Sequence, residues 1–273
     1  MSAWPARVGV IGAGAMGAAF AAGLVRGRAD LASGLRFADV HAPAAELAAA
    51  QVGGRPGSVA EVGAADLVCL AVKPKDAEEA LAELRPALRP GAVLLSVVLG
   101  LGLDRLADAV PAGVAVVRTM PNLAVRHGAG ILVLAARGLA SDDEVRVRAL
   151  LEPLGTVVEL PESLFAAATA LAGSGPGFVA LVAEGLEEGA VAAGLSRAAA
   201  REMVQGVLAG TAALLADGDD PAALRQRVSS PAGSTVQGVA VLERGAVRAH
   251  LADAVRAAAE AAAAQDRAQG AGR

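Results

Sequence analysis

Tyrosine is absent from this sequence and tryptophan occurs once, so aromatic residues make up only 2% of the 273 residues. The net charge is −4, and lysine and arginine do not gather in a basic stripe. Proteins that bind nucleic acids usually combine such a stripe with aromatic side chains, so we expect no nucleic-acid partner. No apolar run reaches the roughly 18 residues of a membrane span, and the start lacks the pattern of a signal peptide. The sequence therefore predicts a cytoplasmic protein with no membrane partner.

Cysteine and histidine are also scarce. The single cysteine, Cys69, lies in the apolar run 67–72, and we interpret it as a buried core residue rather than a nucleophile. The three histidines, His41, His127 and His250, are far apart, and none pairs recognisably with a carboxylate. We therefore expect no metal site.

Apolar residues, mostly alanine, are abundant at 55% of the chain. In the first half, short apolar runs alternate with helical patterns, which predicts an α/β Rossmann-type domain over residues 1–162 with a mostly parallel sheet. Asp104 and Ser141 are expected to cap helices, and Ser58 with Glu61 has the spacing of a capping box. The expected strands are 7–11, 35–38, 67–72, 92–97, 114–118, 131–134 and 156–160, and the expected helices are 15–26, 43–50, 76–84 and 141–151.

The pattern changes after Pro161, and no convincing strand follows. Residues 163–273 are predicted to form an all-α domain, with Ser196 as one N-cap and Pro221 at another helix start. The stretches 165–193 and 203–215 are apolar around most of the helix circumference, more than a monomer of two layers can bury. We therefore expect a homodimer or a larger homo-oligomer built from dimers.

A glycine-rich turn directly follows the first expected strand and opens the first helix; it reads Gly12-Ala13-Gly14-Ala15-Met16-Gly17. The first glycine makes the tight turn, the second lets the backbone approach a pyrophosphate, and the third lets the helix pack close to the strand. The helix N-terminus offers free N–H groups and partial positive charge to the phosphates. The sequence predicts NADH or NADPH binding, and the alternative is a tight turn without a ligand.

Asp39 ends the second expected strand, about 20 residues past the last glycine, where an acid accepts hydrogen bonds from the ribose of NAD and repels the 2′-phosphate of NADP. This position gives a slight preference for NADH. The alternative for Asp39 is a turn residue that faces water. Arg36 is a possible phosphate ligand, but it lies within the strand.

Five segments, in this order and spacing, resemble pyrroline-5-carboxylate reductases along nearly the whole chain. They are 12–24, Ala71-Val72-Lys73-Pro74, Arg118-Thr119-Met120-Pro121-Asn122, Gly173-Ser174-Gly175-Pro176 and Val228-Ser229-Ser230-Pro231-Ala232-Gly233-Ser234-Thr235. The resemblance implies a Rossmann domain, an all-helical dimerisation domain, and hydride transfer from NADH or NADPH to the C=N carbon of pyrroline-5-carboxylate, which gives proline.

The resemblance also implies roles for single residues. The loop 229–235 holds the substrate carboxylate, with Ser230, Gly233, Ser234 and Thr235 as substrate-binding residues. The hydroxyl of Thr235 contacts the ring nitrogen, which makes it the candidate catalytic residue; the alternative is a helix N-cap. The expected cofactor-binding residues are 12–17, Asp39, Ala71, Val72, Lys73, Pro74 and Asn122. Pro74 can also simply end its strand, and Asn122 can have a structural role.

Three segments depart from the family pattern near the expected site. The family usually has Thr-Pro-Ala where this chain has Leu123-Ala124-Val125, and Ala-Ala-Gly where it has Val98-Leu99-Gly100. Where the family loop usually reads Ser-Pro-Gly-Gly-Thr-Thr, this chain has Ala232 in place of the first glycine and Ser234 in place of the first threonine. The first two changes add apolar volume and favour a second hypothesis, the reduction of a different cyclic imine.

Two further alternatives remain. A β-hydroxyacid-type dehydrogenase would need a lysine in the second domain, and no lysine follows Lys75. A non-catalytic dinucleotide sensor would keep the fold, but retention of Thr235 and its loop argues against it.

Overall fold

The computed structural model describes residues 4–270, with side chains described as far as residue 267. The chain forms two compact units, one of Met1–Gly173 with Ala258–Arg273 and one of Ser174–Ala257. The first unit thus includes the segment 163–173 and the C-terminal part of the described residues. The domain boundary expected between residues 162 and 163 stays a prediction.

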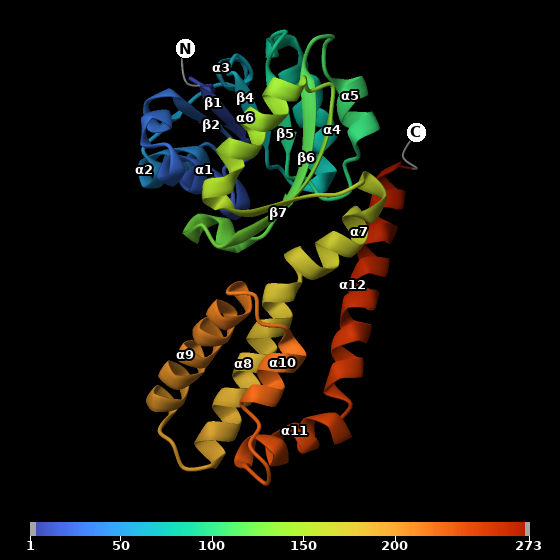
Figure 1. Ribbon diagram of the computed structural model, residues 1–273. Helices are drawn as coiled ribbons and strands as arrows, with labels where there is room; N and C mark the ends of the chain where they lie inside the picture. The colour runs from blue at the N-terminus through green and yellow to red at the C-terminus, as the bar shows by residue number, and fades with distance from the viewer. Residues whose placement is uncertain (1–3, 271–273) are drawn as a thin grey trace. The chain divides into compact units, whose positions relative to one another are not determined.

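The first unit is built on an eight-stranded sheet in the order β3-β2-β1-β4-β5-β6-β7-β8 (Figure 1). All neighbouring strands are parallel except β6 and β7, which confirms the mostly parallel sheet. The two-residue strand β3 was not expected, because one of its two residues is a proline. The strands are β1 (Val8–Ile11), β2 (Leu35–Ala38), β3 (Arg55–Pro56), β4 (Leu67–Leu70), β5 (Val93–Ser96), β6 (Ala115–Pro121), β7 (Gly130–Arg137) and β8 (Gly155–Glu159).

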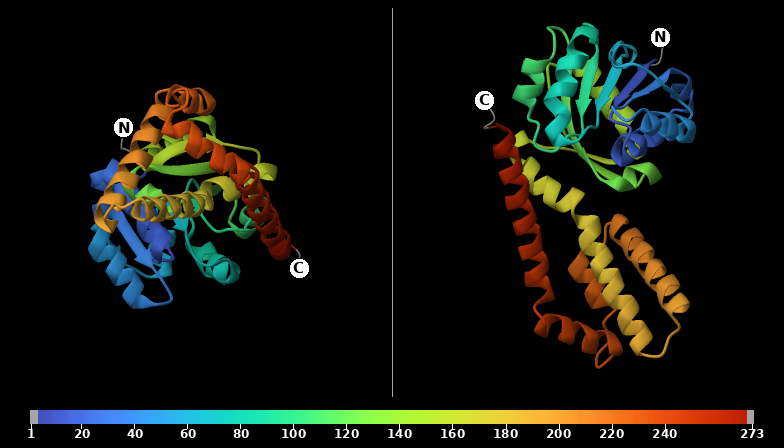
Figure 2. Two further views of the ribbon diagram at one scale, coloured as in Figure 1. Left: turned by 90° about the horizontal axis from the view of Figure 1, so that it is seen from below. Right: turned by 180° about the vertical axis from the view of Figure 1, so that it is seen from behind.

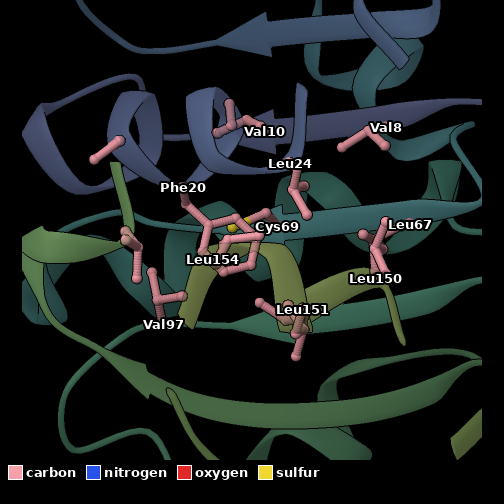
Figure 3. Close-up of a cluster of buried hydrophobic side chains, with 14 of the residues drawn as sticks. Val8, Val10, Phe20, Leu24, Leu67, Cys69, Val97, Leu150, Leu151 and Leu154 are labelled. Atoms are coloured by element: carbon pink, nitrogen blue, oxygen red, sulfur yellow. The ribbon is translucent and has the colours of Figure 1, made fainter. Parts of the chain in front are cut away.

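Helices cover both faces of this sheet, and each face has its own apolar core (Figures 1 and 2). The first core is covered by α1 (Ala15–Gly27), α2 (Ala42–Val52) and α6 (Ser141–Leu151). Figure 3 shows it, with Phe20 and Leu24 of α1 packed with Cys69 and with Leu150 and Leu151 of α6. The second core is covered by α3 (Val59–Gly63), α4 (Ala77–Leu84) and α5 (Leu103–Ala109). The doubly covered sheet explains why β1, β4 and β5 read as continuous apolar runs.

Local capping signals were only partly right. Ser58 and Glu61 form the expected capping box at α3. Asp104 is not a cap, because α5 begins after Gly102 and a distant carboxylate, that of Glu162, accepts the N–H of Leu103. Ser141 is not a cap either, because α6 begins at Ser141 itself and Ala140 precedes it. Three acidic residues in the first turn of α6 complement its positive end instead.

The first unit continues past β8 through a chain of short helices. These are η6 (Glu162–Leu164), α7 (Phe165–Ala168) and the π-helix η7 (Thr169–Gly173). Phe165 and Ala172 pack against Val133 of β7 in a small third core, which attaches this segment to the sheet.

The second unit is helical, and every described residue after Glu159 lies outside strands, as the sequence predicts. It holds α8 (Gly175–Ala192), α9 (Arg197–Ala216), α10 (Pro221–Arg227) and α11 (Ser234–Arg244). The last helix, α12 (Val247–Gly270), begins in this unit and ends in the first. Ser196 caps α9 and Asp220 caps α10 ahead of Pro221, which confirms both expected helix starts.

One helical stretch corrects an expectation from the sequence. Glu162–Ala192 is 31 residues long and contains an 18-residue window with a mean hydropathy of 1.6, so it is long and apolar enough to cross a membrane by length and composition alone. The sequence showed no such span because small residues, not a run of large apolar ones, make this stretch apolar. One such helix is weak evidence of a membrane protein, and the comparisons below give its exposed side chains another explanation.

Candidate dinucleotide and substrate site

The turn after β1 is shaped by two close backbone contacts. Gly12 has a φ of +91°, and a Cβ there would lie 2.6 Å from the carbonyl carbon and oxygen of Ala71. A Cβ on Gly17 would lie 2.0 Å from the carbonyl oxygen of Gly12. Neither position accepts a side chain without movement of the backbone, so both glycines have steric roles of the kind predicted.

Gly14 differs from these two glycines because a Cβ there would meet nothing within 4 Å. It is exposed, together with Ala15, and it precedes α1 as the N-cap residue without any side-chain hydrogen bond. No acidic residue occupies the first turn of α1. The positive end of this 13-residue helix is therefore open and carries no acidic residue in its own first turn, which suits a diphosphate. This opening is the feature that fits a dinucleotide.

The strand order places this turn at a topological switch point. β1 lies between β2 and β4 and is parallel to both. The loops that follow β1 and β4 therefore start at the same carboxyl edge of the sheet. In open α/β sheets, ligands bind in the crevice at such a point. Ala71 and Val72 lie at the end of β4 beside the turn, half-buried, and Lys73 and Pro74 follow on the surface. Pro74 opens the short helix η2 (Pro74–Asp76), and β4 has already ended at Leu70, so the alternative that Pro74 ends the strand is wrong.

Asp39 lies at the end of β2, as expected, and it is half-buried rather than a free turn residue. One carboxylate oxygen accepts the N–H of Ala13 at 2.7 Å, and the other accepts the N–H of His41 at 2.9 Å. The carboxylate therefore fixes the glycine-rich turn and also places a negative charge beside it. Its contact with a ribose stays a prediction.

Arg36, the other side chain considered near this end of β2, is directed toward α3. Its Cδ lies 3.3 Å from the position of a Cβ on Gly57. The pKa of Glu61 is lowered, first by the hydrogen bond from the Ser58 N–H and least by the charge of Arg36. Nη1 of Arg36 is buried without a hydrogen-bond partner among the described residues. Nothing in this arrangement supports Arg36 as a phosphate ligand.

Asn122 directly follows β6 at the carboxyl edge and is 7% exposed. Its Nδ2 donates to the carbonyl oxygen of Ala172 at 3.0 Å, and its Oδ1 accepts the N–H of Ala124 at 3.2 Å. The structural role considered for this residue is therefore present. A contact with the cofactor stays a prediction.

The loop 229–235 lies in the second unit and leads into α11. Gly233 is the N-cap residue, without a side-chain hydrogen bond, and the first turn of α11 carries no acidic residue. Thr235 is the second residue of the helix, so the N-cap alternative for it is wrong. The exposed Ser230 and Ser234 flank this uncapped end, whose free N–H groups suit a carboxylate.

Ala232 in this loop has a φ of +58°, in the left-handed region. It follows Pro231, and the N–H of Gly233 donates to the carbonyl of Ser230 at 3.0 Å. Proline followed by a residue of positive φ is typical of a type II turn, which favours glycine at the second place. The departure from the family pattern at this position therefore has a cost in backbone strain.

Cys69 is fully buried, and burial raises the pKa of its thiol to about 12. The thiol is protonated at neutral pH and out of reach of solvent. This confirms its interpretation as a core residue.

Comparison with known proteins identifies the family. Residues 162–265 match the family model for pyrroline-5-carboxylate reductase dimerisation, and residues 7–100 match that for NADP oxidoreductase, coenzyme F420-dependent. The pyrroline-5-carboxylate reductase of Synechocystis sp. is 35% identical over 257 residues, which cover 92% of this chain and 95% of that protein. The chain belongs to the pyrroline-5-carboxylate reductase family.

Other members of the family agree over the same length. The pyrroline-5-carboxylate reductase of Methanosarcina acetivorans is 33% identical and covers 93% of this chain and 96% of its own. The solved pyrroline-5-carboxylate reductase of Coxiella burnetii has a TM-score of 0.87 at 25% identity, covering 96% of this chain and 98% of its own. The Plasmodium falciparum pyrroline carboxylate reductase, solved with NADP bound, has a TM-score of 0.83 at 27% identity. The match covers 95% of this chain and 98% of that protein. This chain is therefore an NAD(P)-dependent oxidoreductase with a Rossmann fold.

Within this reductase, the first unit brings the residues 12–17, Asp39, 71–74 and Asn122 to one edge of the sheet. The substrate-loop residues belong to the second unit and are placed only within it. Sequence reasoning did not single out Arg118, the one charged residue in the core of the described chain. The signal was present as an arginine that directly follows Val116 and Val117 in an apolar strand.

Proposed function

We propose that this chain reduces the C=N bond of 1-pyrroline-5-carboxylate to give L-proline, the last step of proline biosynthesis, with NADH or NADPH as the reductant. The observation that carries the proposal is the open N-terminus of α1, framed by Gly12 and Gly17, in a chain of this reductase family. The helical domain and its uncapped α11 support a carboxylate-bearing substrate.

The cofactor residues act mainly by position. The amides around Gly14 and Ala15 bind the diphosphate, and Asp39 keeps the turn in shape through the N–H of Ala13. Ala71 to Pro74 and Asn122 line the same edge of the sheet. When bound, the cofactor supplies the hydride. The chain contributes orientation and the exclusion of water, which are large effects in such reactions.

The substrate residues bind the carboxylate and the ring nitrogen. In this proposal the free N–H groups at the start of α11, with Ser230, Gly233 and Ser234, hold the carboxylate. The hydroxyl of Thr235 contacts the ring nitrogen. A protonated imine accepts hydride more readily than a neutral one, so a substrate that binds protonated needs no strong acid from the protein.

We further propose that NADH is preferred. In this proposal the carboxylate of Asp39 meets the ribose, where the 2′-phosphate of NADPH would approach, and the three residues after it, Val40, His41 and Ala42, include no lysine or arginine. A like charge at this place disfavours the phosphate. The ratio of kcat/KM for NADH to that for NADPH measures this preference, and a ratio below one would contradict it.

The family match supports homo-oligomerisation. We propose a homodimer as the basic assembly, with larger rings built from dimers, because the second unit exposes large apolar side chains on α8, α9 and α11. These include Val179, Leu181, Val182, Leu186, Met203, Val207, Val241 and Leu242. A partner chain would also cover the apolar stretch 162–192. The cytoplasmic location expected from the sequence stays a prediction.

A second candidate function, the reduction of a different cyclic imine, is favoured by one side chain. Of the departures from the family pattern in the first unit, Val98 and Val125 are buried in the cores. Leu123, next to Asn122, is 58% exposed at the carboxyl edge. An apolar side chain at this place would favour a larger or less polar ring.

The test is a spectrophotometric assay with NADH or NADPH and a panel of cyclic imines that includes pyrroline-5-carboxylate. The proposal expects the highest kcat/KM with pyrroline-5-carboxylate. A higher value with another imine, restored toward pyrroline-5-carboxylate by Leu123→Thr, would support the second candidate. Cofactor binding without turnover of any imine would indicate a dinucleotide sensor.

Thr235→Ala should lower kcat by about 100-fold or more while leaving the Kd for NADH within about twofold, because only the transition-state contact is lost. Thr235→Ser keeps the hydroxyl and serves as the matched control, with a kcat close to that of the wild type. An Ala variant as active as the Ser variant would remove Thr235 from the site.

A further inference from the structure

Arg118 lies on β6 with only 5% of its side chain exposed, inside the first unit. Arginine is almost never fully buried unless it is paired. Its partners therefore show which parts of the chain this charge joins.

The guanidinium of Arg118 contacts three groups. Its Nη1 donates to Oε1 of Glu162 at 2.8 Å, and its Nη2 lies 3.3 and 3.4 Å from the two carboxylate oxygens of Asp266. The ring of Phe165 stacks beneath it, with its centroid 4.7 Å away. Glu162 is 44 residues and Asp266 is 148 residues from Arg118 in the sequence. Figure 1 shows the helices concerned, with α7 beside the C-terminal part of α12.

Glu162 extends this cluster to the loop that follows β5. The same Oε1 accepts the N–H of Leu103 at 2.8 Å, and Leu103 is the first residue of α5. The loop between β5 and α5 is therefore fixed through Glu162 to Arg118.

Asn122, which directly follows β6, holds the other end of the same segment through the carbonyl of Ala172. The segment 162–173 is thus attached to β6 at its start by Arg118 and near its end by Asn122. The chain leaves the first unit at Gly173 and returns to it at Ala258, within α12. The two segments of the first unit that border these crossings, 162–173 and 258–267, are both attached to one strand, the first through Glu162 and the second through Asp266.

Stability alone does not account for this cluster. A buried ion pair often contributes no more to folding than apolar side chains of the same volume, because removal of both charges from water is costly. Its geometry, however, is specific, since a guanidinium offers donors in fixed directions and each partner must meet one of them. The cluster therefore defines where two distant segments lie against β6.

We propose that Arg118 is a positioning residue: its buried guanidinium, held by Glu162 and Asp266, fixes the segments 162–173 and 258–267, which border the two chain crossings, and through Glu162 also the loop after β5. The functional part of this proposal rests on the proposed reductase activity, because that proposal places the cofactor and the imine at the carboxyl edge of the sheet. The positioning itself can be measured without turnover.

The first experiment is hydrogen–deuterium exchange of the full-length protein without ligand. Arg118→Met keeps the apolar stem but removes the charge, and exchange in the peptides 162–173 and 258–267 should rise by at least about tenfold. The matched control is Arg137→Met on the neighbouring strand β7, where the arginine pairs with Asp104 but is 58% exposed. The control should leave exchange in both peptides unchanged. Unchanged exchange in Arg118→Met would overturn the proposal.

The second experiment separates positioning from core packing through kinetics. In Arg118→Met, kcat should fall by at least about tenfold while the Kd for NADH changes by less than about threefold, and Arg118→Lys should recover part of kcat. Equal losses of kcat and NADH affinity, without rescue by lysine, would show a general loss of packing and contradict the proposal. If the wild type reduces no imine, the proposed function fails, and the exchange result still decides whether Arg118 fixes the two segments.

Asp266→Asn covers the case in which Arg118→Met does not fold. This side chain is 29% exposed, so its replacement leaves no gap in the core. Exchange should rise in 258–267 and stay unchanged in 162–173, because Glu162 still pairs with Arg118. An equal rise in both peptides, or in neither, would contradict the assignment of one carboxylate to each segment.

Discussion

The two compact units treat their apolar residues in opposite ways. In the first unit, helices cover both faces of the sheet and large side chains such as Phe20, Phe37 and Leu94 are completely buried. In the second, α8 and α11 have no buried residue, and α9 buries only Ala200 and Val204 of its 20 residues. The first unit holds its own core, whereas the second has the composition of a core but exposes it. The difference indicates that the dinucleotide half folds around itself and the helical half folds against a partner.

The largest effect is expected for a substitution in the glycine-rich turn 12–17 of the first unit. Gly17→Ala places a methyl group 2.0 Å from the carbonyl oxygen of Gly12, so α1 must move away from β1. The Kd for NADH should rise by at least about 100-fold, or about 2.7 kcal/mol. The melting temperature should fall as well. Isothermal titration and differential scanning calorimetry measure the two effects.

Gly14→Ala is the matched variant, because its methyl group meets nothing in the protein within 4 Å. NADH binding should weaken by about tenfold, since the methyl group enters the space kept for the diphosphate, while the melting temperature stays within a few degrees. If Gly14→Ala bound NADH as well as the wild type does, the diphosphate would not lie at this turn.

The next effect tests the exposed apolar surface of the second unit. Leu181 on α8 and Val145 on α6 are each 68% exposed. Leu181→Lys should weaken the dimer by about 2 kcal/mol per protomer, because a partner chain would bury this leucine. Val145→Lys should leave the assembly unchanged. Analytical ultracentrifugation reports both, and equal behaviour of the two variants would erase the contrast between the units.

A smaller effect is expected at Asp39. Asp39→Asn removes the negative charge and replaces two charged hydrogen bonds by one neutral acceptor, at a cost of about 1–1.5 kcal/mol of unfolding free energy. The ratio of kcat/KM for NADPH to that for NADH should rise, because the repulsion of the 2′-phosphate is removed. An unchanged ratio, with the same loss of stability, would limit Asp39 to its bonds with Ala13 and His41.

The smallest effect is expected for a substitution in the loop 229–235 of the second unit. Ala232→Gly relieves the strain of a positive φ in the loop 229–235 and should raise the unfolding free energy by about 0.5–1 kcal/mol. Urea denaturation of the wild type and the variant, at equal protein concentration, measures it. A loss of stability would mean that the methyl group of Ala232 makes contacts in the assembly that outweigh the strain.

The sequence predicted most of the first unit because its signals are local. The strand 35–38, the helix 141–151 and the capping box of Ser58 agree with the structure, since each depends on neighbouring residues. The turn at Gly12 was also predictable, because its glycines, strand and helix are contiguous. The first residue of α5 was not, because its N–H is bonded by Glu162, 59 residues away.

The site shows the same division. Asp39 was placed at the end of its strand, but its bond to the N–H of Ala13 depends on how two strands align in space. Thr235 was expected near a helix start, and only the backbone shows that Gly233 is the cap. The left-handed conformation of Ala232 contradicts its residue type, so local preference could not reveal it. The buried Arg118 depends on partners as far away as Asp266.

The central claim is that the turn at Gly12–Gly17 presents a reduced nicotinamide dinucleotide to a cyclic imine. The most direct measurement uses NADH in which both hydrogens of the hydride-donating carbon are replaced by deuterium, together with pyrroline-5-carboxylate, and mass spectrometry of the product. The account predicts proline with one deuterium on the carbon that was double-bonded to nitrogen, formed by the wild type and strongly reduced in Gly17→Ala. Proline without deuterium, or no proline from a protein that binds NADH, would contradict it.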